Sequence, residues 1–147
     1  MVDVALTIEG SAPADLDAVV ALYTSVGWLV YAKDPEGLER AMDAAHYVVQ
    51  ARRGDRLIGL ARCLSDDVSI AYIQDILVHP DEQGKGVGRA LMEDILQRYS
   101  HVRQKVLLTD DRPGQLHFYA SLGFHNTREL VKTPLNAFVR YEGVEVG

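Results

Sequence analysis

The sequence is poor in several features that mark particular classes of protein. Cys63 is its only cysteine, which excludes internal disulfide bonds and zinc or iron–sulfur sites built from several cysteines. No apolar run approaches the ~18 residues that could span a membrane, and residues 1–10 lack the basic and apolar regions of a signal peptide. Lysine and arginine, 15 in total, are outnumbered by 21 acidic residues, and the net charge of −6 disfavours binding to nucleic acid. We therefore expect a cytoplasmic protein without nucleic-acid or membrane partners.

The rest of the composition is that of an ordinary folded protein. With 147 residues, of which 48% are hydrophobic and 24% charged, the chain is long enough to bury a core without metals or disulfides. It contains no internal repeat, low-complexity tract or Pro/Ser-rich linker. We therefore expect a single domain over residues 1–147.

Hydrophobic periodicity alternates along the chain between strand and helix patterns. Asp34 followed by Pro35 is typical of a helix start, and Gly54-Asp55 is typical of a hairpin turn. Residues 68–78 have apolar side chains on both faces, which predicts an interior strand covered on both sides. Strands are expected at residues 4–8, 47–49, 57–64, 68–78, 105–108 and 138–141, and helices at 16–23, 35–45, 87–96 and 114–122. The order β-α-α-β-β-β-α-β-α-β predicts a mixed α/β fold.

A glycine-rich loop follows the longest predicted strand and opens a helix. It reads Gln83-Gly84-Lys85-Gly86-Val87-Gly88-Arg89-Ala90, and its glycines and helix-start N–H groups suit a phosphate or pyrophosphate group. A P-loop is excluded because Gly86 follows Lys85 where Ser or Thr is required. The dinucleotide pattern G-x-G-x-x-G also fails, although Asp110 lies at a distance that suits it. The pattern Q/R-x-x-G-x-G/A is matched, and a turn that only caps the helix is the alternative.

Two motifs resemble the GNAT superfamily of acyl-CoA-dependent N-acyltransferases. Ile76-Leu77-Val78-His79-Pro80 together with the glycine loop looks like its acetyl-CoA motif. His117-Phe118-Tyr119-Ala120-Ser121-Leu122-Gly123-Phe124 looks like its second signature, F-Y-x-x-x-G-F. The resemblance implies a mostly antiparallel central sheet flanked by helices, with acetyl-CoA as the acetyl donor and no metal. One departure is Asp110-Asp111-Arg112-Pro113, which stands where many relatives carry an Asn that contacts the cofactor.

The resemblance also implies which residues hold acetyl-CoA. The strand before the loop would splay from its neighbour, so that the backbone of Leu77 and Val78 bonds the pantetheine amides. A backbone amide near Leu77 would stabilise the oxyanion. The loop N–H groups would take the pyrophosphate, with added charge from Lys85 or Arg89. The residues assigned to the cofactor in this way are Leu77, Val78, Gln83, Gly84, Lys85, Gly86, Val87, Gly88, Arg89, Ala90 and Phe118.

Transfer to an amine requires a proton donor and a proton acceptor. Tyr119 stands where the family places its general acid, which protonates the departing thiolate; packing in the core is its alternative role. Asp75 interrupts an apolar strand, and a buried carboxylate needs either a structural partner or a function. Asp75 is therefore the candidate base. Asp110 and Asp111 are alternatives that equally fit an exposed turn and a helix cap.

Trp28 and Tyr31 lie between the first two predicted helices, a segment that borders the acceptor site in the resembling family. Aromatic side chains there suit an organic amine, and packing of the loop is the equal alternative. The five histidines show no metal-ligand spacing. Cys63 lies in an alternating strand and is expected to be a small core residue.

These observations predict an N-acetyltransferase that moves an acetyl group from acetyl-CoA to a primary amine. Because the chain is net acidic and Asp75, Asp110 and Asp111 fall at strand ends, a small cationic amine is the expected acceptor. Three rivals stay open: a non-catalytic acyl-CoA-binding or regulatory module, an N-acetyltransferase of proteins or peptides, and a nicotinamide-dependent oxidoreductase. A homodimer is common in the resembling family, and the sequence leaves the oligomeric state open.

Overall fold

The computed structural model describes residues 4–144, and two aspartate side chains fix where its first long helices begin. Asp15 Oδ1 accepts the N–H of Asp17 at 3.0 Å and caps α1, Leu16–Ser25. Asp34 Oδ1 accepts the N–H of Gly37 at 3.0 Å and caps α3, Pro35–Ala44. Each cap satisfies an N–H group that has no partner inside its helix. The helix start predicted at Asp34-Pro35 is confirmed.

A short helix that the sequence pattern did not predict lies between these two. Gly27 adopts a left-handed backbone with a φ of +79°, which ends α1, and the N–H of Trp28 then bonds the carbonyl of Tyr23 at 3.1 Å. The following residues form α2, Leu29–Ala32, which has only 4 residues. One helical turn is too short for a hydrophobic periodicity to reveal it.

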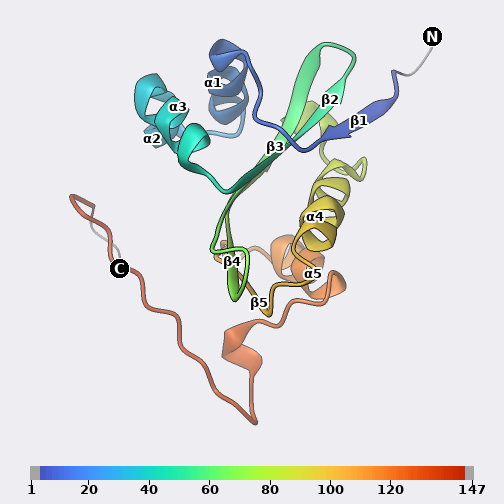
Figure 1. The fold of residues 1–147 in the computed structure, drawn as a ribbon. Helices are drawn as coiled ribbons and strands as arrows, with labels where there is room; N and C mark the ends of the chain where they lie inside the picture. Colours follow the sequence, from blue (N-terminus) through green and yellow to red (C-terminus); the bar gives the residue numbers. More distant parts are fainter. Residues whose placement is uncertain (1–3, 145–147) are drawn as a thin grey trace. The chain divides into compact units, whose positions relative to one another are not determined.

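Five strands form one open sheet in the order β1-β2-β3-β4-β5 (Figure 1). Their bounds are Leu6–Glu9, Tyr47–Arg53, Arg56–Ser65, Ile70–Val78 and Gln104–Leu107. The first three pairings are antiparallel and the pairing of β4 with β5 is parallel. The predicted mixed, mostly antiparallel α/β architecture is therefore confirmed, as is the hairpin at Gly54-Asp55.

The strand β4 lies between β3 and β5, as predicted, but it keeps its second neighbour for only half its length. Its last pair with β5 is Ile73 with Leu107, whereas its pairing with β3 continues to Val78. Among residues 4–144, the segment Gln74–Val78 is therefore paired with a strand on one edge only.

A β-bulge at Gln74 changes which side chains of β4 share a face. Arg62 is paired with Asp75 but Cys63 with Ile73, so Gln74 is an extra residue in β4. Alternation alone would put Asp75 on the same face as Ile73. Because of the bulge, Asp75 lies instead on the face of Arg62, opposite to Ile73.

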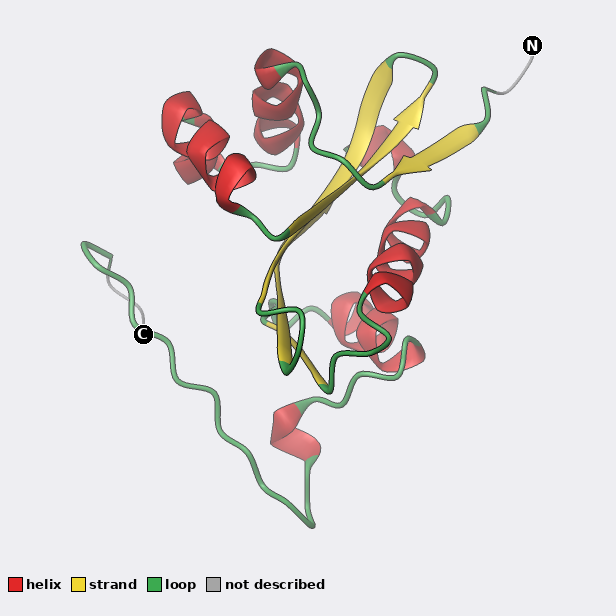
Figure 2. Ribbon diagram, in the orientation of Figure 1, coloured by secondary structure: helices red, strands yellow, loops and turns green. Residues whose placement is uncertain are grey.

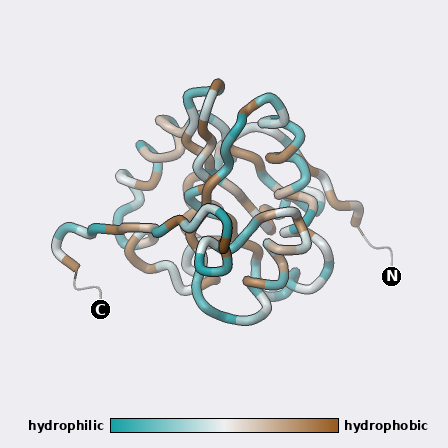
Figure 3. Tube along the Cα trace, turned by 90° about the horizontal axis from the view of Figure 1, so that it is seen from below, coloured by the Kyte–Doolittle hydropathy of each residue, from teal (hydrophilic) through white to brown (hydrophobic). Residues whose placement is uncertain are grey.

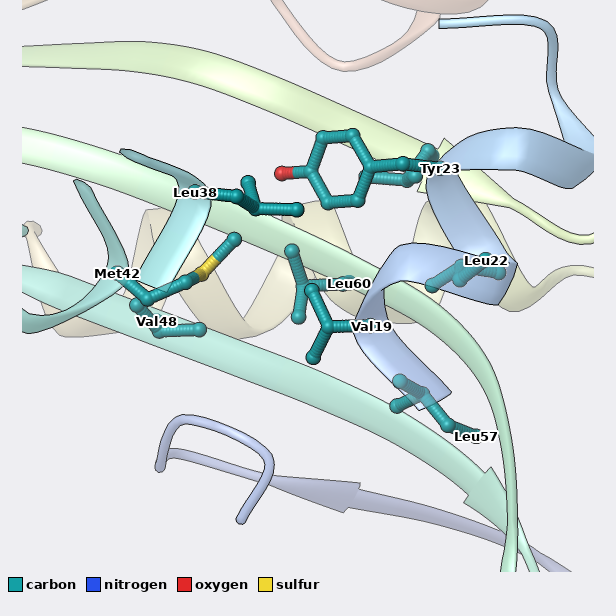
Figure 4. Close-up of a cluster of buried hydrophobic side chains, with 9 residues drawn as sticks. Val19, Leu22, Tyr23, Leu38, Met42, Val48, Leu57 and Leu60 are labelled. Carbon is teal, nitrogen blue, oxygen red and sulfur yellow. The ribbon is translucent and has the colours of Figure 1, made fainter. Parts of the chain in front are cut away.

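Helices cover both faces of the sheet in the segment up to Leu108 (Figure 1). On one face α1 packs over β3 and β4 and α3 packs against α1, and on the other face lies α4, Val87–Arg98. Gly59 makes room for α4, since a Cβ there would lie 3.1 Å from Val87 Cγ1. A buried cluster under α1 and α3 (Figure 4) comprises Val19, Leu22, Tyr23, Leu38, Met42, Val48, Leu57, Leu60 and Leu77.

The chain divides after Leu108, and the second unit contains α5, Pro113–Ser121, and the 3₁₀ turn η2, Thr127–Glu129. The last strand predicted, around Phe138–Tyr141, is wrong: this segment is drawn as loop in Figure 2 and pairs with no strand among the described residues. Apolar and polar residues are mixed along the C-terminal segment (Figure 3), and Phe138 is 93% exposed. Alternation produces a strand only where a partner backbone takes its hydrogen bonds. That the whole chain forms one domain stays a prediction.

Candidate functional site

The loop between β4 and α4 is held in place by hydrogen bonds to the strands β3 and β4. The N–H of His79 bonds the carbonyl of Ile58 at 2.8 Å, and Gln83 Nε2 donates to the carbonyl of Val78 at 3.1 Å. The side chain of Gln83 therefore closes the loop back onto the end of β4. Sequence reasoning placed Gln83 in this site without predicting that contact.

Two glycines give the loop its shape. Gly84 and Gly86 have φ values of +77° and +84°, and a Cβ built on either would meet no atom within 4 Å. Gly86 is the N-cap of α4, where it contributes no side-chain cap, and its carbonyl accepts the N–H of Ala90 at 3.0 Å. The N–H groups of the first turn have no acceptor inside the helix. This helix start can thus offer backbone donors and the positive end of the helix dipole to an anion.

Among the other predicted cofactor residues, the structure separates buried side chains from exposed ones. Val87 and Leu77 are buried in the core, so only their backbone groups could meet a ligand. Lys85 and Arg89 are exposed and their side chains can reach into solvent. Leu77 and Val78 lie in the segment of β4 that β5 leaves unpaired.

A buried ion pair that sequence reasoning missed anchors the loop. Glu82 is only 5% exposed, although the loop residues that follow it, from Gln83 to Gly86, are exposed. Its Oε2 is 3.0 Å from Nε of Arg53 at the end of β2. This hydrogen bond lowers the pKa of the Glu82 carboxyl. Lys85 Nζ lies 3.9 Å from the same oxygen. No short-range pattern links Arg53 to Glu82, because the contact is made by the tertiary structure.

A second buried ion pair lies on the face of the sheet beneath α1. Asp75 Oδ2 accepts hydrogen bonds from Tyr23 Oη at 2.8 Å and from Arg62 Nε at 2.9 Å. The side chains of Arg62 and Asp75 are 8% and 3% exposed. Burial opposes the charge of Arg62, but the adjacent carboxylate outweighs it and raises the pKa of the guanidinium. Burial and Asp75 together raise the pKa of the Tyr23 hydroxyl. Of the two roles considered for a buried Asp75, a structural partner is therefore present.

The two aromatic residues predicted for the acceptor lie beside this ion pair. The ring of Tyr31 is 5.2 Å from that of Tyr23 and 5.8 Å from Arg62 Cζ, and Trp28 is 6.0 Å from Tyr23. Gln74, the bulged residue, donates from Nε2 to Tyr31 Oη at 3.2 Å. The structure therefore brings Trp28, Tyr31 and Asp75 together around Tyr23. It adds Tyr23 and Arg62. The sequence signal for Arg62 was a charged residue inside an otherwise apolar strand, and the sequence held no signal that Tyr23 would meet Asp75.

The second signature motif forms the end of α5. Gly123 has a φ of +91°, and the N–H of Phe124 bonds the carbonyl of Tyr119 at 3.1 Å. The Tyr119 ring packs against the rings of Phe118 and Phe124, at centroid distances of 5.1 and 6.0 Å. Burial, and to a smaller extent Asp110, raises the pKa of Tyr119 to about 12. The glycine and phenylalanine of the motif thus close the helix and fix the ring of its tyrosine.

The alternative acidic residues are exposed and paired within the second unit. Asp110 Oδ2 lies 2.9 Å from Arg112 Nε, and this hydrogen bond lowers its pKa. Asp111 Oδ1 lies 3.1 Å from Arg128 Nη1. Their assignment as bases stays a prediction.

Cys63 is fully buried, as expected for a core residue, and burial raises its pKa to about 12. Among residues 4–144, no group of three His, Cys, Asp or Glu side chains is arranged to hold a metal ion. Over the same residues, no helix combines the length and apolarity needed to cross a membrane.

Comparison with known proteins agrees with this geometry. A sequence model described as an acetyltransferase (GNAT) domain matches residues 19–142. An uncharacterized N-acetyltransferase, ycf52, of Gracilaria tenuistipitata var. liui is 34% identical over 115 residues, covering 76% of this chain and 62% of the relative. A ycf52-like N-acetyltransferase of Prochlorococcus marinus is 36% identical over 117 residues, covering 75% and 62%. This chain therefore spans less than two thirds of the length of these relatives.

A solved structure shows the same fold over nearly the whole chain. The GNAT family acetyltransferase SP0256 from Streptococcus pneumoniae TIGR4 has a TM-score of 0.77 and 30% identity, covering 93% of this chain and 100% of that one. The family model thus matches most of the sequence. The matched residues include the free edge of β4, the glycine-capped start of α4 and the motif at the end of α5. The chain belongs to the GNAT family of acetyltransferases.

Proposed function

We propose that this chain transfers an acetyl group from acetyl-CoA to the primary amine of a small molecule, by direct attack of the amine on the thioester. The observation that carries the proposal is the change of pairing in β4. Beyond Ile73 its edge is free of β5, and the same strand runs into the glycine-capped start of α4. An extended pantetheine arm needs a free strand edge, and a pyrophosphate needs a cluster of N–H donors.

In this proposal the cofactor is held mainly by backbone groups. Leu77 and Val78 offer amide and carbonyl groups to pantetheine. The N–H groups from Lys85 to Arg89 receive the pyrophosphate, because the N–H of Ala90 already bonds the carbonyl of Gly86. Lys85 and Arg89 supply positive charge near the pyrophosphate. A backbone amide near Leu77 stabilises the negative charge that develops on the thioester oxygen.

The amine attacks the thioester carbon, the C–S bond breaks, and the thiolate leaves with a proton from Tyr119. With a pKa raised to about 12, Tyr119 keeps its proton throughout the neutral range and can therefore act as the donor. The amine must lose a proton in the same sequence of steps. Asp75 stays the predicted acceptor, although its Oδ2 already receives two hydrogen bonds.

The acceptor is proposed to lie beside Trp28 and Tyr31. Their rings offer apolar surface, and Tyr31 already interacts through its face with the guanidinium of Arg62. A cytoplasmic location and a homodimer stay predictions. The oxidoreductase alternative has less support, because the dinucleotide fingerprint fails and the family model that matches residues 19–142 is that of an acetyltransferase domain.

The proposal is tested by replacing Gly86 with leucine. A side chain there meets no protein atom within 4 Å, so its steric effect falls on whatever occupies the space next to the loop. The left-handed backbone adds a strain of roughly 1–2 kcal/mol. Gly143, with a φ of +72° and equally open surroundings, provides a matched control.

Acetyl-CoA should raise the melting temperature of the wild type and of Gly143→Leu but not that of Gly86→Leu. A panel of small amines and peptides, scored by release of CoA thiol, should then show turnover of a small amine by the wild type. An unaltered affinity of Gly86→Leu for acetyl-CoA would refute the assignment of the loop. Preferential acetylation of peptides over every small amine would refute the acceptor class.

A further inference from the structure

The guanidinium of Arg62 has more hydrogen-bond donors than the protein uses. Its Nε donates to Asp75, and its Cζ lies over the ring of Tyr31. Among the described residues, Nη1 and Nη2 make no hydrogen bond, so their four N–H groups lack a protein acceptor. If the only role of Arg62 were to neutralise Asp75, these four N–H groups would not be needed.

Each of these two nitrogens keeps some contact with solvent, although the side chain is 92% covered. Arg62 has 8% side-chain exposure, and within residues 4–144 no fully buried side-chain nitrogen or oxygen lacks a partner. The remaining exposure of Arg62 therefore includes the unpaired ends of its guanidinium. A long cationic side chain on the surface samples many rotamers. The side chain of Arg62 is instead held by its ion pair with Asp75 on one edge and by the ring of Tyr31 on one face.

The fixed edge matches one chemical group. The two Nη atoms of an arginine form a planar fork that binds both oxygens of a carboxylate, and a prepositioned fork loses little freedom on binding. Asp75 occupies the Nε side, so a second carboxylate would approach from a different edge of the guanidinium. Tyr23 Oη also donates to Asp75, which lessens the demand of Asp75 on Arg62.

The surroundings of Arg62 place this fork in the region proposed for the acceptor. The ring of Tyr31 lies against Arg62, and Tyr23 packs against the rings of both Tyr31 and Trp28. Gln74 donates to Tyr31 Oη at the point where β5 leaves β4. Resting on the proposed function, we propose that Arg62 is a specificity residue that binds a carboxylate on the acceptor. The preferred substrate is then an amine that also carries a carboxylate, such as an amino acid with an aromatic or apolar side chain.

The test compares tyrosine, tyrosinamide and tyramine as acceptors, which differ only in the group that would meet Arg62. The amines of these compounds have different pKa values, so the rates of one enzyme cannot be compared directly. The readout is therefore the tyrosine-to-tyramine ratio of kcat/KM in the wild type divided by that ratio in Arg62→Lys. Lysine keeps a charge for Asp75 and loses the fork. Arg103→Lys, at an exposed site, is the control, and a peptide with an acidic first residue distinguishes free amino acids from peptides.

We expect the tyrosine-to-tyramine ratio of kcat/KM to be about tenfold or more lower in Arg62→Lys than in the wild type. The same ratio should be unchanged in Arg103→Lys. The tyrosinamide-to-tyramine ratio, which involves no carboxylate, should be equal in the wild type and Arg62→Lys. An equal tyrosine-to-tyramine ratio in wild type and Arg62→Lys would overturn the proposal. If Arg62→Lys does not fold, calorimetry on the wild type replaces it: N-acetyltyrosine should bind more tightly than N-acetyltyramine, and the reverse order overturns the proposal. A wild type that binds acetyl-CoA and acetylates only tyramine refutes the carboxylate site alone, whereas one that acetylates no amine refutes the proposed function.

Discussion

At the scale of single residues, burial sets the protonation of the groups that could take part in chemistry. Burial is the main cause that raises the pKa of both Cys63 and Tyr119 to about 12. A protonated thiol is a poor nucleophile, whereas a protonated phenol is a proton donor. The same physical effect therefore removes Cys63 from chemistry and keeps Tyr119 available as an acid.

Replacement of Tyr119 by phenylalanine keeps the ring and removes only the hydroxyl. We expect kcat to fall by ~10²–10⁴-fold, as is typical for a lost general acid, while affinity for acetyl-CoA persists. In the wild type, kcat/KM should rise with pH as the amine loses its proton. Ionisation of Tyr119 should cause no loss across the neutral range, because burial raises its pKa.

Steady-state kinetics and a pH profile check this expectation. Tyr141→Phe serves as the control, because Tyr141 is 52% exposed and belongs to the same unit. A Tyr119→Phe enzyme that works within a few-fold of the wild type would leave Tyr119 with a packing role only.

At the scale of elements, the loop before α4 owes its position to residues far away in the chain. The Arg53–Glu82 pair joins β2 to η1, Pro80–Glu82, and Gln83 ties the loop to the end of β4. A loop whose N–H groups are held in place before a ligand arrives loses less conformational freedom on binding it. The pair also prevents Glu82 from standing as an uncompensated negative charge beside the loop proposed to bind the pyrophosphate.

Replacement of Glu82 by glutamine should therefore weaken recognition of the pyrophosphate. We expect the ratio of kcat/KM for acetyl-CoA to that for acetylpantetheine, which has no pyrophosphate, to fall about tenfold. Arg53→Met should act in the same direction.

Asp81→Asn is the neighbouring control, because the side chain of Asp81 is 76% exposed and its ion pair with Arg56 is loose, at 3.7 Å. Equal losses with both acetyl donors would mean that Glu82 supports the fold in general and does not position this loop.

At the scale of the whole molecule, several carboxyl groups are stabilised in their ionised form by the fold. The pKa of Asp66 is lowered by Ser69 and by backbone N–H groups, that of Asp67 by His101, that of Glu82 by Arg53, and that of Asp110 by Arg112. A folded-state pKa below the unfolded one gives stability that is complete above the unfolded value, ~4, and is lost as pH falls further.

The urea midpoint of unfolding should therefore decrease progressively when the pH is lowered from 5 to 3. Asp66→Asn cannot ionise, so it should be less stable than the wild type at pH 7 and lose less stability on acidification. Circular dichroism at each pH measures both. A wild-type midpoint that is the same at pH 5 and pH 3 would contradict the assigned pKa directions.

Much of the fold could be predicted because its signals are local. Asp34-Pro35 carries its own cap and backbone angle, Gly54-Asp55 its own turn, and the glycine loop its own need for left-handed backbone. These signals depend on neighbouring residues alone. The segment around Phe138 has a local strand pattern too, yet it forms no strand, since a strand also needs a partner that no local pattern supplies.

The sequence by itself thus determined the four longer helices, the hairpin, the loop and the two motifs that reveal the family. Only the tertiary structure decided on which face of the sheet a side chain lies and which distant residue it contacts. The bulge at Gln74 turns Asp75 to the side of Arg62, and the contacts of Tyr23 with Asp75 and of Arg53 with Glu82 span 52 and 29 residues. The physical reason is that capping, turns and periodicity are short-range, whereas strand register and buried charge pairs depend on which distant segments pack together.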